Sequence, residues 1–312
     1  MPEQRTPMTA TRTVRRDGDQ PTRQLKADIC VAGAGIAGVS AALEAARLGR
    51  DVVLIDGLPA LGGQAVNSII GTFCGLFSNG PEPYQLTHGI ADDILHDLGK
   101  IDALHYRRGP WTTVMYDEMA LSRWIEEAVR SAGITVVLGA IINGVRVEGK
   151  RISGVDLVTR YGDLALEAEG FVDATGDSVL AWLAGFRCNE PADGSVYGTQ
   201  MLVLENIDEA RQPSRDELSE RLEQKAAEYG LVRDDGFAFV FPGRGTALVN
   251  MNHVETPLEP VAASEKTLEG KAMTDSVSAF LKAEFPDAFG GARVRAYGFP
   301  GIRQTRWIHG TQ

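Results

Sequence analysis

The sequence predicts an α/β protein: a Rossmann-like, dinucleotide-binding domain with a parallel sheet and a β-meander, followed by a mixed α+β domain. The first observation is residues 28–56, which read as a strand, a glycine-rich turn, a helix, a second strand and a terminal acid. Ile29, Val31 and the run 52–55 suit strands that are buried on both faces. The second observation is a change after Cys188, where short strands alternate with helices and no second glycine fingerprint follows.

Three glycines in residues 28–56 have separate steric roles. Gly33 permits the tight turn, Gly35 lets the backbone approach a pyrophosphate, and Gly38 lets the helix pack closely on the strand. Gly49 then ends the helix. Because the flanking periodicities agree with this spacing, the motif is more specific than an isolated Gly-x-Gly-x-x-Gly.

The start of the helix and the acid after the second strand complete this predicted site. The N–H groups of Ile36 and Ala37 are expected to face the diphosphate, where the helix dipole also favours negative charge. Asp56 is placed to accept hydrogen bonds from the adenosine ribose and to repel a 2′-phosphate. The segment therefore predicts an adenine dinucleotide that lacks a 2′-phosphate.

Later segments resemble FAD-dependent oxidoreductases of the glutathione-reductase-like and fumarate-reductase-flavoprotein-like superfamily. The resemblance rests on the doublet Gly62-Gly63 just beyond Asp56, on Phe171-Val-Asp-Ala-Thr-Gly-Asp177, and on residues 116–121, 249–252 and 301–306. It covers roughly residues 28–308 and implies FAD rather than NAD. It also implies cofactor contacts beyond the fingerprint: Gly62, Gly63, Gln64, Ile142, Ala174, Thr175, Gly176 and Asp177.

Periodicity and turn signals predict the remaining elements. Helices are expected at 83–99, 117–132, 214–229 and 260–284, with strands at 134–138, 144–147, 152–159, 164–168, 199–204, 237–241 and 247–251. The chain is expected to re-enter the parallel sheet at 170–174. The predicted domains are a disordered extension (1–27), an FAD-binding domain (28–187), a substrate domain (188–299) and the start of a return to the first domain (300–312).

Composition excludes several classes of function. The net charge of −11 argues against a nucleic-acid partner, because phosphate binding depends on clustered Lys and Arg. No apolar run is long enough to span a bilayer, and no signal-peptide core precedes residue 28. With three widely spaced cysteines, the chain is expected in the reducing cytoplasm and lacks the close cysteine pair of a disulfide reductase.

Two of these cysteines differ in their expected surroundings. Cys30 lies inside the first strand and is expected to be a small buried hydrophobe. Cys74 follows the glycine doublet, in a loop that faces the flavin in the family that this sequence resembles. A structural role is still favoured for Cys74, because no neighbouring base is evident that would generate a thiolate.

The predicted chemistry belongs mainly to the flavin, whose N5 exchanges a hydride with a small organic substrate. Arg303 and Arg306, three residues apart, could clamp a substrate carboxylate, or they could form interdomain ion pairs. His253 could act as a general base or as a hydrogen-bonded structural histidine. The sequence has no group of His and Cys at the spacing of metal ligands, so no metal is predicted.

The resemblance also raises an expectation about the chain end. In the resembling proteins, the chain returns to the FAD domain after the Gly-Ile-Arg motif and contacts the flavin end of FAD, whereas this sequence stops at Gln312. The flavin site is therefore expected to need a further segment, a partner chain or a homo-oligomer. Two other hypotheses stay open: a catalytically inactive dinucleotide-binding or regulatory subunit, and an enzyme that uses the dinucleotide as substrate, like thiazole-synthase-type relatives of this fold.

Overall fold

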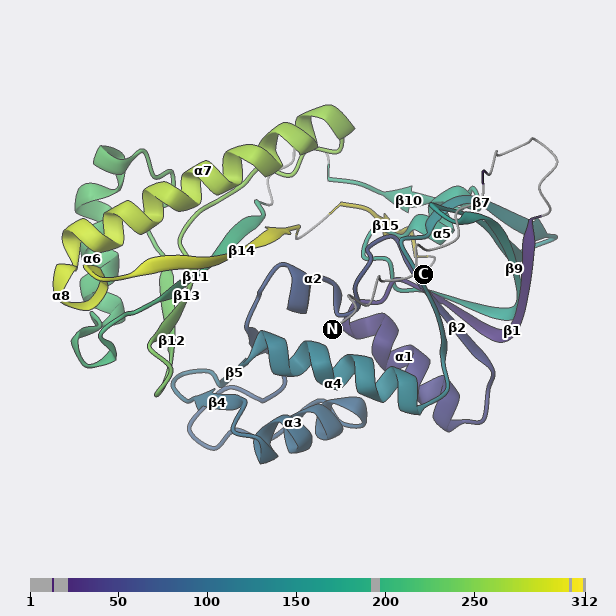
Figure 1. Cartoon of the computed structure of the whole chain (residues 1–312), viewed down its shortest axis with the longest axis horizontal. Helices are drawn as coiled ribbons and strands as arrows, with labels where there is room; N and C mark the ends of the chain where they lie inside the picture. The colour runs from purple at the N-terminus through teal and green to yellow at the C-terminus, as the bar shows by residue number, and fades with distance from the viewer. Residues whose placement is uncertain (1–12, 14–21, 192–196, 303–304, 311–312) are drawn as a thin grey trace, which may run out of the picture.

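The chain forms two lobes in a computed structural model that describes residue 13 and residues 22–191, 197–302 and 305–310. The first lobe holds a six-stranded sheet, and the second lobe holds a four-stranded sheet (Figure 1). A long helix, α7 (Pro260–Glu284), runs along the outer side of the second lobe. This arrangement confirms the predicted fold class, with a parallel core in the first lobe and antiparallel sheets elsewhere.

The six-stranded sheet has the order β6-β2-β1-β9-β8-β7. Its first four strands are parallel, and the last three form the predicted antiparallel meander. The strands are β1 (Arg23–Ala32), β2 (Val52–Asp56), β6 (Thr135–Leu138), β7 (Ile141–Glu148), β8 (Arg151–Thr159) and β9 (Gly162–Asp173).

Strand β9 corrects one prediction. The sequence predicts separate strands at 164–168 and 170–174, but residues 162–173 form one strand. Its first half pairs with β8 while most of its length pairs with β1, so the same strand ends the meander and joins the parallel sheet. Pairing with β1, in which Gly170 lies opposite Ile29, carries the strand through Gly170. The partner strand β1 begins at Arg23, opposite Leu164, so the expected boundary after residue 27 falls inside a strand.

Three helices pack on one side of this sheet, with α3 (Ile90–Lys100) lying against α1 (Ile36–Arg47) and α4 (Glu118–Ser131). Apolar residues at helical spacing, such as Leu121 and Ile125 of α4, are fully buried there. Helix α3 begins later than predicted because Gly89 has a positive φ of 78° and its N–H donates to Asp92. The short helices are α2 (Gly63–Asn67) and α5 (Val179–Leu183).

A small antiparallel sheet, β3-β5-β4, was not predicted. It consists of β3 (Thr72–Cys74), β5 (Thr113–Tyr116) and β4 (Leu104–Arg107). All four residues of β5 are buried, so the strand lacks the alternation of a half-exposed strand. Its burial comes from long-range pairing, which is why local periodicity did not reveal it.

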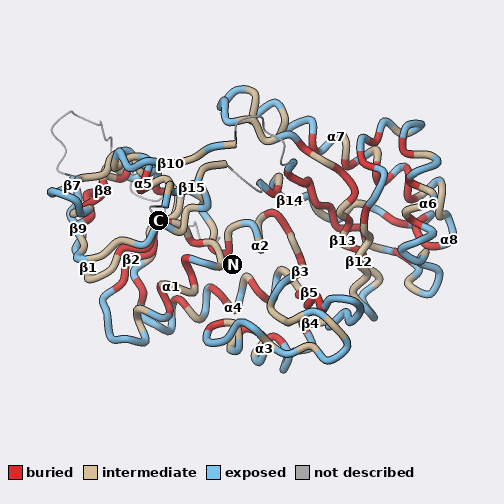
Figure 2. Tube along the Cα trace, turned by 180° about the vertical axis from the view of Figure 1, so that it is seen from behind, coloured by how far each residue is buried: buried red, intermediate tan, exposed pale blue. Residues whose placement is uncertain are grey.

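The second lobe is an antiparallel sheet in the order β12-β13-β11-β14, with helices packed on one face. On β11, Leu202 and Leu204 face the core formed with α7, whereas Met201 and Val203 pack with Ile69 from the first lobe. Both faces of β11 are therefore buried, and buried residues gather in the interior of this lobe (Figure 2). The elements are β11 (Thr199–Glu205), β12 (Phe237–Phe241), β13 (Thr246–Asn250), β14 (Arg293–Gly301), α6 (Arg215–Lys225), α8 (Pro286–Phe289) and the 3-10 turns Glu209–Arg211 and Ala226–Tyr229.

Contacts between the lobes come from segments far apart in sequence. Arg244, in the turn between β12 and β13, pairs with Asp117 and donates a 3.1 Å hydrogen bond to the Asp102 carbonyl. Near the chain end, β15 (Trp307–Ile308) pairs with β10 (Cys188–Asn189) beside the first lobe. The second lobe is therefore attached at the Arg244 turn as well as through the chain connections.

Candidate functional site

Two glycines of the fingerprint are required by packing within the protein. A Cβ on Gly33, where φ is +96°, would lie 2.6 Å from the Ala174 carbonyl carbon. A Cβ on Gly38 would overlap the Gly33 carbonyl oxygen and lie 3.2 Å from the Ala174 Cβ. The turn after β1, helix α1 and the end of β9 thus meet without room for a side chain.

Gly35 differs, because space rather than protein lies beside it. A Cβ there would meet only the Cα of Gly63, at 3.9 Å. Gly35 is the N-cap of α1, no side chain caps this helix, and its first turn holds no acid. The first N–H groups of the helix, including those of Ile36 and Ala37, have no acceptor within the helix. This open, donor-rich helix start fits a diphosphate.

Asp56 is fixed by the backbone on both sides. Its Oδ2 accepts a 2.6 Å hydrogen bond from the Ala34 N–H, and its Oδ1 accepts one of 2.7 Å from the Leu58 N–H. Each carboxylate oxygen has a further lone pair. The side chain is therefore oriented at the carboxyl end of β2, where it could also accept ribose hydroxyls.

Helix α2 connects this glycine cradle, which we define as Gly33–Gly38 with Asp56, to the gap between the lobes. Gly62 and Gly63 have positive φ of 92° and 50°, and a Cβ on Gly63 would lie 2.7 Å from the Cα of Gly35. Gln64 follows and donates a 2.7 Å hydrogen bond to the Ile302 carbonyl. The predicted doublet thus lies against the cradle, and Gln64 contacts the end of the second lobe.

The other residues that the resemblance assigns to FAD have different surroundings. Ala174 packs against Gly33 and Gly38, and Gly176 has a φ of +83° with open space beside it. The Thr175 hydroxyl bonds Asp173, and it accepts the Val179 N–H at 3.0 Å.

Asp177 and Ile142 are more enclosed. Asp177 accepts a hydrogen bond from the Thr305 hydroxyl, and burial raises the pKa of its carboxyl, an effect that Arg306 partly offsets. The Ile142 side chain packs in the core beneath the sheet. Its neighbour Ile141 is exposed and lies beside Gly57, next to Asp56, and the assignment of Ile142 to the cofactor site stays a prediction.

Of the three candidate catalytic residues, Arg303 lies outside the described residues, and Arg306 and His253 have different partners. Arg306 pairs with Glu190 at 2.8 Å, its guanidinium lies 4.1 Å from the centre of the Trp182 ring, and its side chain is only 16% exposed. The ring of His253 stacks on Tyr197, with centroids 5.2 Å apart. The Arg306 ion pair lies beside the paired strands β10 and β15, and the role of Arg306 toward a substrate stays a prediction.

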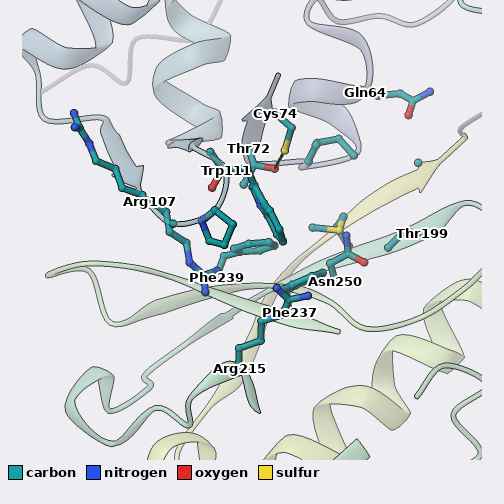
Figure 3. A pocket seen from close by; sticks show the side chains of 17 residues that line it. Gln64, Thr72, Cys74, Arg107, Trp111, Thr199, Arg215, Phe237, Phe239 and Asn250 are labelled. Carbon is teal, nitrogen blue, oxygen red and sulfur yellow. Dashed lines mark hydrogen bonds between the residues drawn. The ribbon is translucent and has the colours of Figure 1, made fainter. Parts of the chain in front are cut away.

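A pocket of about 650 Å³ lies between the lobes, and we call it the interlobe pocket. Side chains from β3, β5 and the loop before β5 face others from β11, β12 and β13 across it (Figure 3). It is lined by Gln64, Ile70, Thr72, Cys74, Arg107, Arg108, Gly109, Pro110, Trp111, Thr113, Thr199, Met201, Arg215, Phe237, Phe239, Asn250 and Gly301. Of these lining residues, the sequence analysis connected only Gln64 and Cys74 with FAD.

A buried charge supports one wall of this pocket. Arg233, 8% exposed, bonds the carboxylate of Asp235 through Nε at 2.5 Å, and its Nη1 donates to the Asn250 Oδ1 at 2.7 Å. Hydrogen bonding to Arg233 lowers the pKa of Asp235, and the charges of Arg233, His253 and Arg215 lower it further. Because Arg233 occupies the Asn250 oxygen, the Asn250 amide N–H groups are left to donate.

All three cysteines are free. Burial raises the pKa of the Cys30 thiol to about 12, as suits the small buried hydrophobe that was predicted. Cys74 is exposed in the interlobe pocket, 4.0 Å from the Thr72 hydroxyl. Across the described residues, no helix has the length and apolarity needed to cross a membrane, and no group of three His, Cys, Asp or Glu is arranged for a metal.

Residues 28–312 match the sequence profile of the FAD dependent oxidoreductase family. The chain therefore belongs to that family, which confirms the predicted cofactor, FAD, and the predicted class, a flavin-dependent oxidoreductase. A search of curated protein sequences finds no match.

Solved structures show the same fold at low sequence identity. A geranylgeranyl bacteriochlorophyll reductase-like protein from Thermoplasma acidophilum has a TM-score of 0.54 at 15% identity, with 89% of this chain and 66% of that chain covered. L-proline dehydrogenase from P. horikoshii has a TM-score of 0.53 at 13% identity, with 91% of this chain and 83% of that chain covered. BexE, studied for oxidation during BE-7585A biosynthesis, has a TM-score of 0.54 at 16% identity, with 90% of this chain and 53% of that chain covered. The chain thus spans less than two thirds of the first and last of these proteins.

Proposed function

We propose that this chain holds FAD at the glycine cradle and takes a small organic, anionic substrate in the interlobe pocket, with a hydride passing between the substrate and the flavin N5. The observation that carries the proposal is that the start of α2 touches both the cradle and the pocket. Gly63 lies against Gly35, and the next residue, Gln64, lines the interlobe pocket. A dinucleotide with its diphosphate at α1 would extend past the start of α2 toward the pocket.

Each part of the chain has a distinct role in this proposal. The N–H groups at the start of α1 bind the diphosphate, and Asp56 accepts hydrogen bonds from the adenosine ribose. When bound, FAD supplies an acceptor or donor for a hydride. The second lobe closes one side of the pocket and limits water there through Phe237, Phe239 and Met201. Gln64 fixes the relation between the two lobes at this point.

Asp56→Ala tests the cofactor half of the proposal. FAD affinity should fall about tenfold or more, because a hydrogen bond to a charged group contributes roughly 1.5–3 kcal/mol. FMN, which lacks the adenosine ribose, should be affected less. Calorimetric titration of the apoprotein with both flavins measures this difference, and Asp287→Ala, an exposed acid on α8, is the control. Equal weakening of both flavins would place Asp56 away from the adenosine.

Reduction of the bound flavin tests the redox half. The FAD-loaded protein should lose its visible absorbance when an oxidisable substrate is added without oxygen, or regain it when the reduced protein meets an electron-accepting substrate. If FAD binds tightly but neither change occurs with any of a broad panel of small organic acids, the alternative of a catalytically inactive dinucleotide-binding subunit gains support. A partner chain that completes the flavin site would instead restore these changes when added.

A further inference from the structure

The interlobe pocket is positively charged in a protein that is acidic overall. The net charge of the chain is −11, yet Arg107, Arg108 and Arg215 line the pocket and no Asp or Glu does. Among the described residues, none of these three guanidinium groups forms an ion pair. Asp235, whose carboxyl feels the charge of Arg215, is hydrogen-bonded to Arg233 instead. A pocket with one sign of charge attracts ligands of the opposite sign.

Aromatic rings, rather than carboxylates, hold two of these arginines. The Arg215 guanidinium carbon lies 4.5 Å from the centre of the Phe237 ring and 5.8 Å from that of Trp111. Arg107 lies 5.8 Å from the centre of the Phe239 ring. Stacking uses the face of a guanidinium and leaves the N–H groups on its edge free to donate. Two planar donors are therefore oriented without being neutralised.

The rings also form a flat, apolar surface next to these donors. Phe237 and Phe239 are stacked with centroids 5.4 Å apart and an interplanar angle of 17°. Trp111 extends toward Phe239 from the opposite side of the pocket (Figure 3). Aromatic faces of this kind prefer a planar aromatic ligand, because offset stacking adds to the free energy of apolar burial.

We propose that the ligand of the interlobe pocket is a planar aromatic carboxylate, bound by Arg107 and Arg215 through its carboxylate and by Trp111 and Phe239 through its ring. This deepens the proposed function, on which it rests. A carboxylate suits the fork of a guanidinium, which binds both of its oxygens. A volume of about 650 Å³ accommodates more than one fused ring.

Two further features favour this assignment over an extra site for the dinucleotide phosphates. Gln64, at the end nearest the glycine cradle, lies on the far side of the pocket from Arg107 and Arg215 (Figure 3). Asn250 lies between these ends with its amide N–H groups left to donate. An amide donor at that position suits a hydroxyl or carbonyl oxygen on the ring of the ligand.

Binding of three related probes to the FAD-loaded protein tests the proposal. The probes are 2-naphthoate, the neutral 2-naphthamide, and decahydro-2-naphthoate, which keeps the charge but not the planar ring. We expect 2-naphthoate to bind about tenfold or more tightly than either of the others, as measured by calorimetry and by the shift of the flavin absorbance. Its affinity should fall with added salt, because the arginines are exposed.

Variants test which side chains bind the carboxylate of the ligand and which bind its ring. Arg215→Gln and Arg107→Gln should each weaken 2-naphthoate about tenfold and leave 2-naphthamide unchanged. Phe239→Leu should reduce the preference for 2-naphthoate over its decahydro form. The matched control is Arg295→Gln, an exposed arginine on β14 that does not line the pocket.

Several results would overturn the assignment. Equal affinity for 2-naphthoate and 2-naphthamide would exclude a charge-selective site, and equal affinity for the decahydro form would exclude recognition of the ring. Competition by inorganic phosphate at the same concentration as 2-naphthoate would indicate a general anion site. Because every measurement starts from protein with bound FAD, these failures differ from loss of FAD binding, which would contradict the proposed function itself.

Discussion

The glycine cradle and the interlobe pocket are specified in different ways. The cradle comes mainly from residues 28–56, and its shape follows from backbone contacts that exclude side chains at Gly33 and Gly38. The pocket is assembled from segments between residues 64 and 301, and its character comes from arginine and aromatic side chains. The two regions therefore differ in origin: backbone contacts shape the proposed cofactor cradle, whereas side chains brought together by long-range packing give the proposed substrate pocket its character.

The largest effect should come from Gly38→Val. Its side chain would overlap the Gly33 carbonyl, so we expect a loss of about 3 kcal/mol or more in the free energy of unfolding. Gly35→Val, three residues earlier, should leave the urea midpoint of the apoprotein nearly unchanged, because open space lies beside Gly35. It should instead weaken FAD binding by roughly a hundredfold, about 2.7 kcal/mol, by occupying the diphosphate position.

Urea unfolding and FAD titration of both variants separate packing from binding within one motif. Gly99→Val, in α3, tests for a general effect of valine in place of a glycine, because Gly99 has no positive φ and a Cβ there would meet nothing within 4 Å. Similar destabilisation by Gly35→Val and Gly38→Val would show that packing requires both glycines, and unchanged FAD affinity in Gly35→Val would show that the cofactor does not need the open space at α1.

A smaller effect is expected where the lobes meet. Arg244→Ala removes the ion pair with Asp117 and the hydrogen bond to the Asp102 carbonyl, and we expect a loss of about 1–2 kcal/mol in stability. Asp117 also caps α4 by accepting the Ala120 N–H, so Asp117→Asn should keep the cap and lose only the charge pairing. A double-mutant cycle in chemical denaturation should give a coupling energy of about 1 kcal/mol.

Arg211→Ala, an exposed arginine in the same lobe, is the control for that cycle. If the Arg244 contact orders the pocket, Arg244→Ala should also weaken the pocket ligand although it does not line the pocket. Strictly additive effects of Arg244→Ala and Asp117→Asn would mean that the turn does not link the lobes energetically.

The smallest effect concerns the pH dependence at Asp177. Burial raises the pKa of this carboxyl above its ordinary value of 3.8, so the folded state holds the proton more tightly than the unfolded state. The stabilising contribution is therefore present below pH 3.8 and is lost as pH rises through the folded-state pKa. Asp177→Asn should slightly raise the melting temperature at pH 7, with the difference vanishing near pH 3.5. Thermal melts against pH, with Asp287→Asn as control, would reject this if the variant were less stable at pH 7.

The sequence by itself determined the cradle and most of the secondary structure. The spacing of Gly33, Gly35 and Gly38 between two strands can be recognised within one segment, although Gly33 and Gly38 also pack against Ala174 after β9. Helices such as α4 and α7 follow from apolar spacing and capping residues. The resemblance of the motifs to a known family also predicted FAD as the cofactor, which the family match confirms. The proposed contacts of individual residues with FAD stay predictions.

The tertiary structure alone decided the pocket and the partners of the candidate catalytic residues. Arg107, Trp111 and Arg215 carry no local signal, because exposed arginines and single aromatic residues occur in any globular chain. They become a site only when the unpredicted sheet β3-β5-β4 packs opposite β12. Arg306 likewise meets Glu190 through the pairing of β10 with β15. Such contacts depend on how sheets pack across long loops, and no periodicity within one segment encodes that packing.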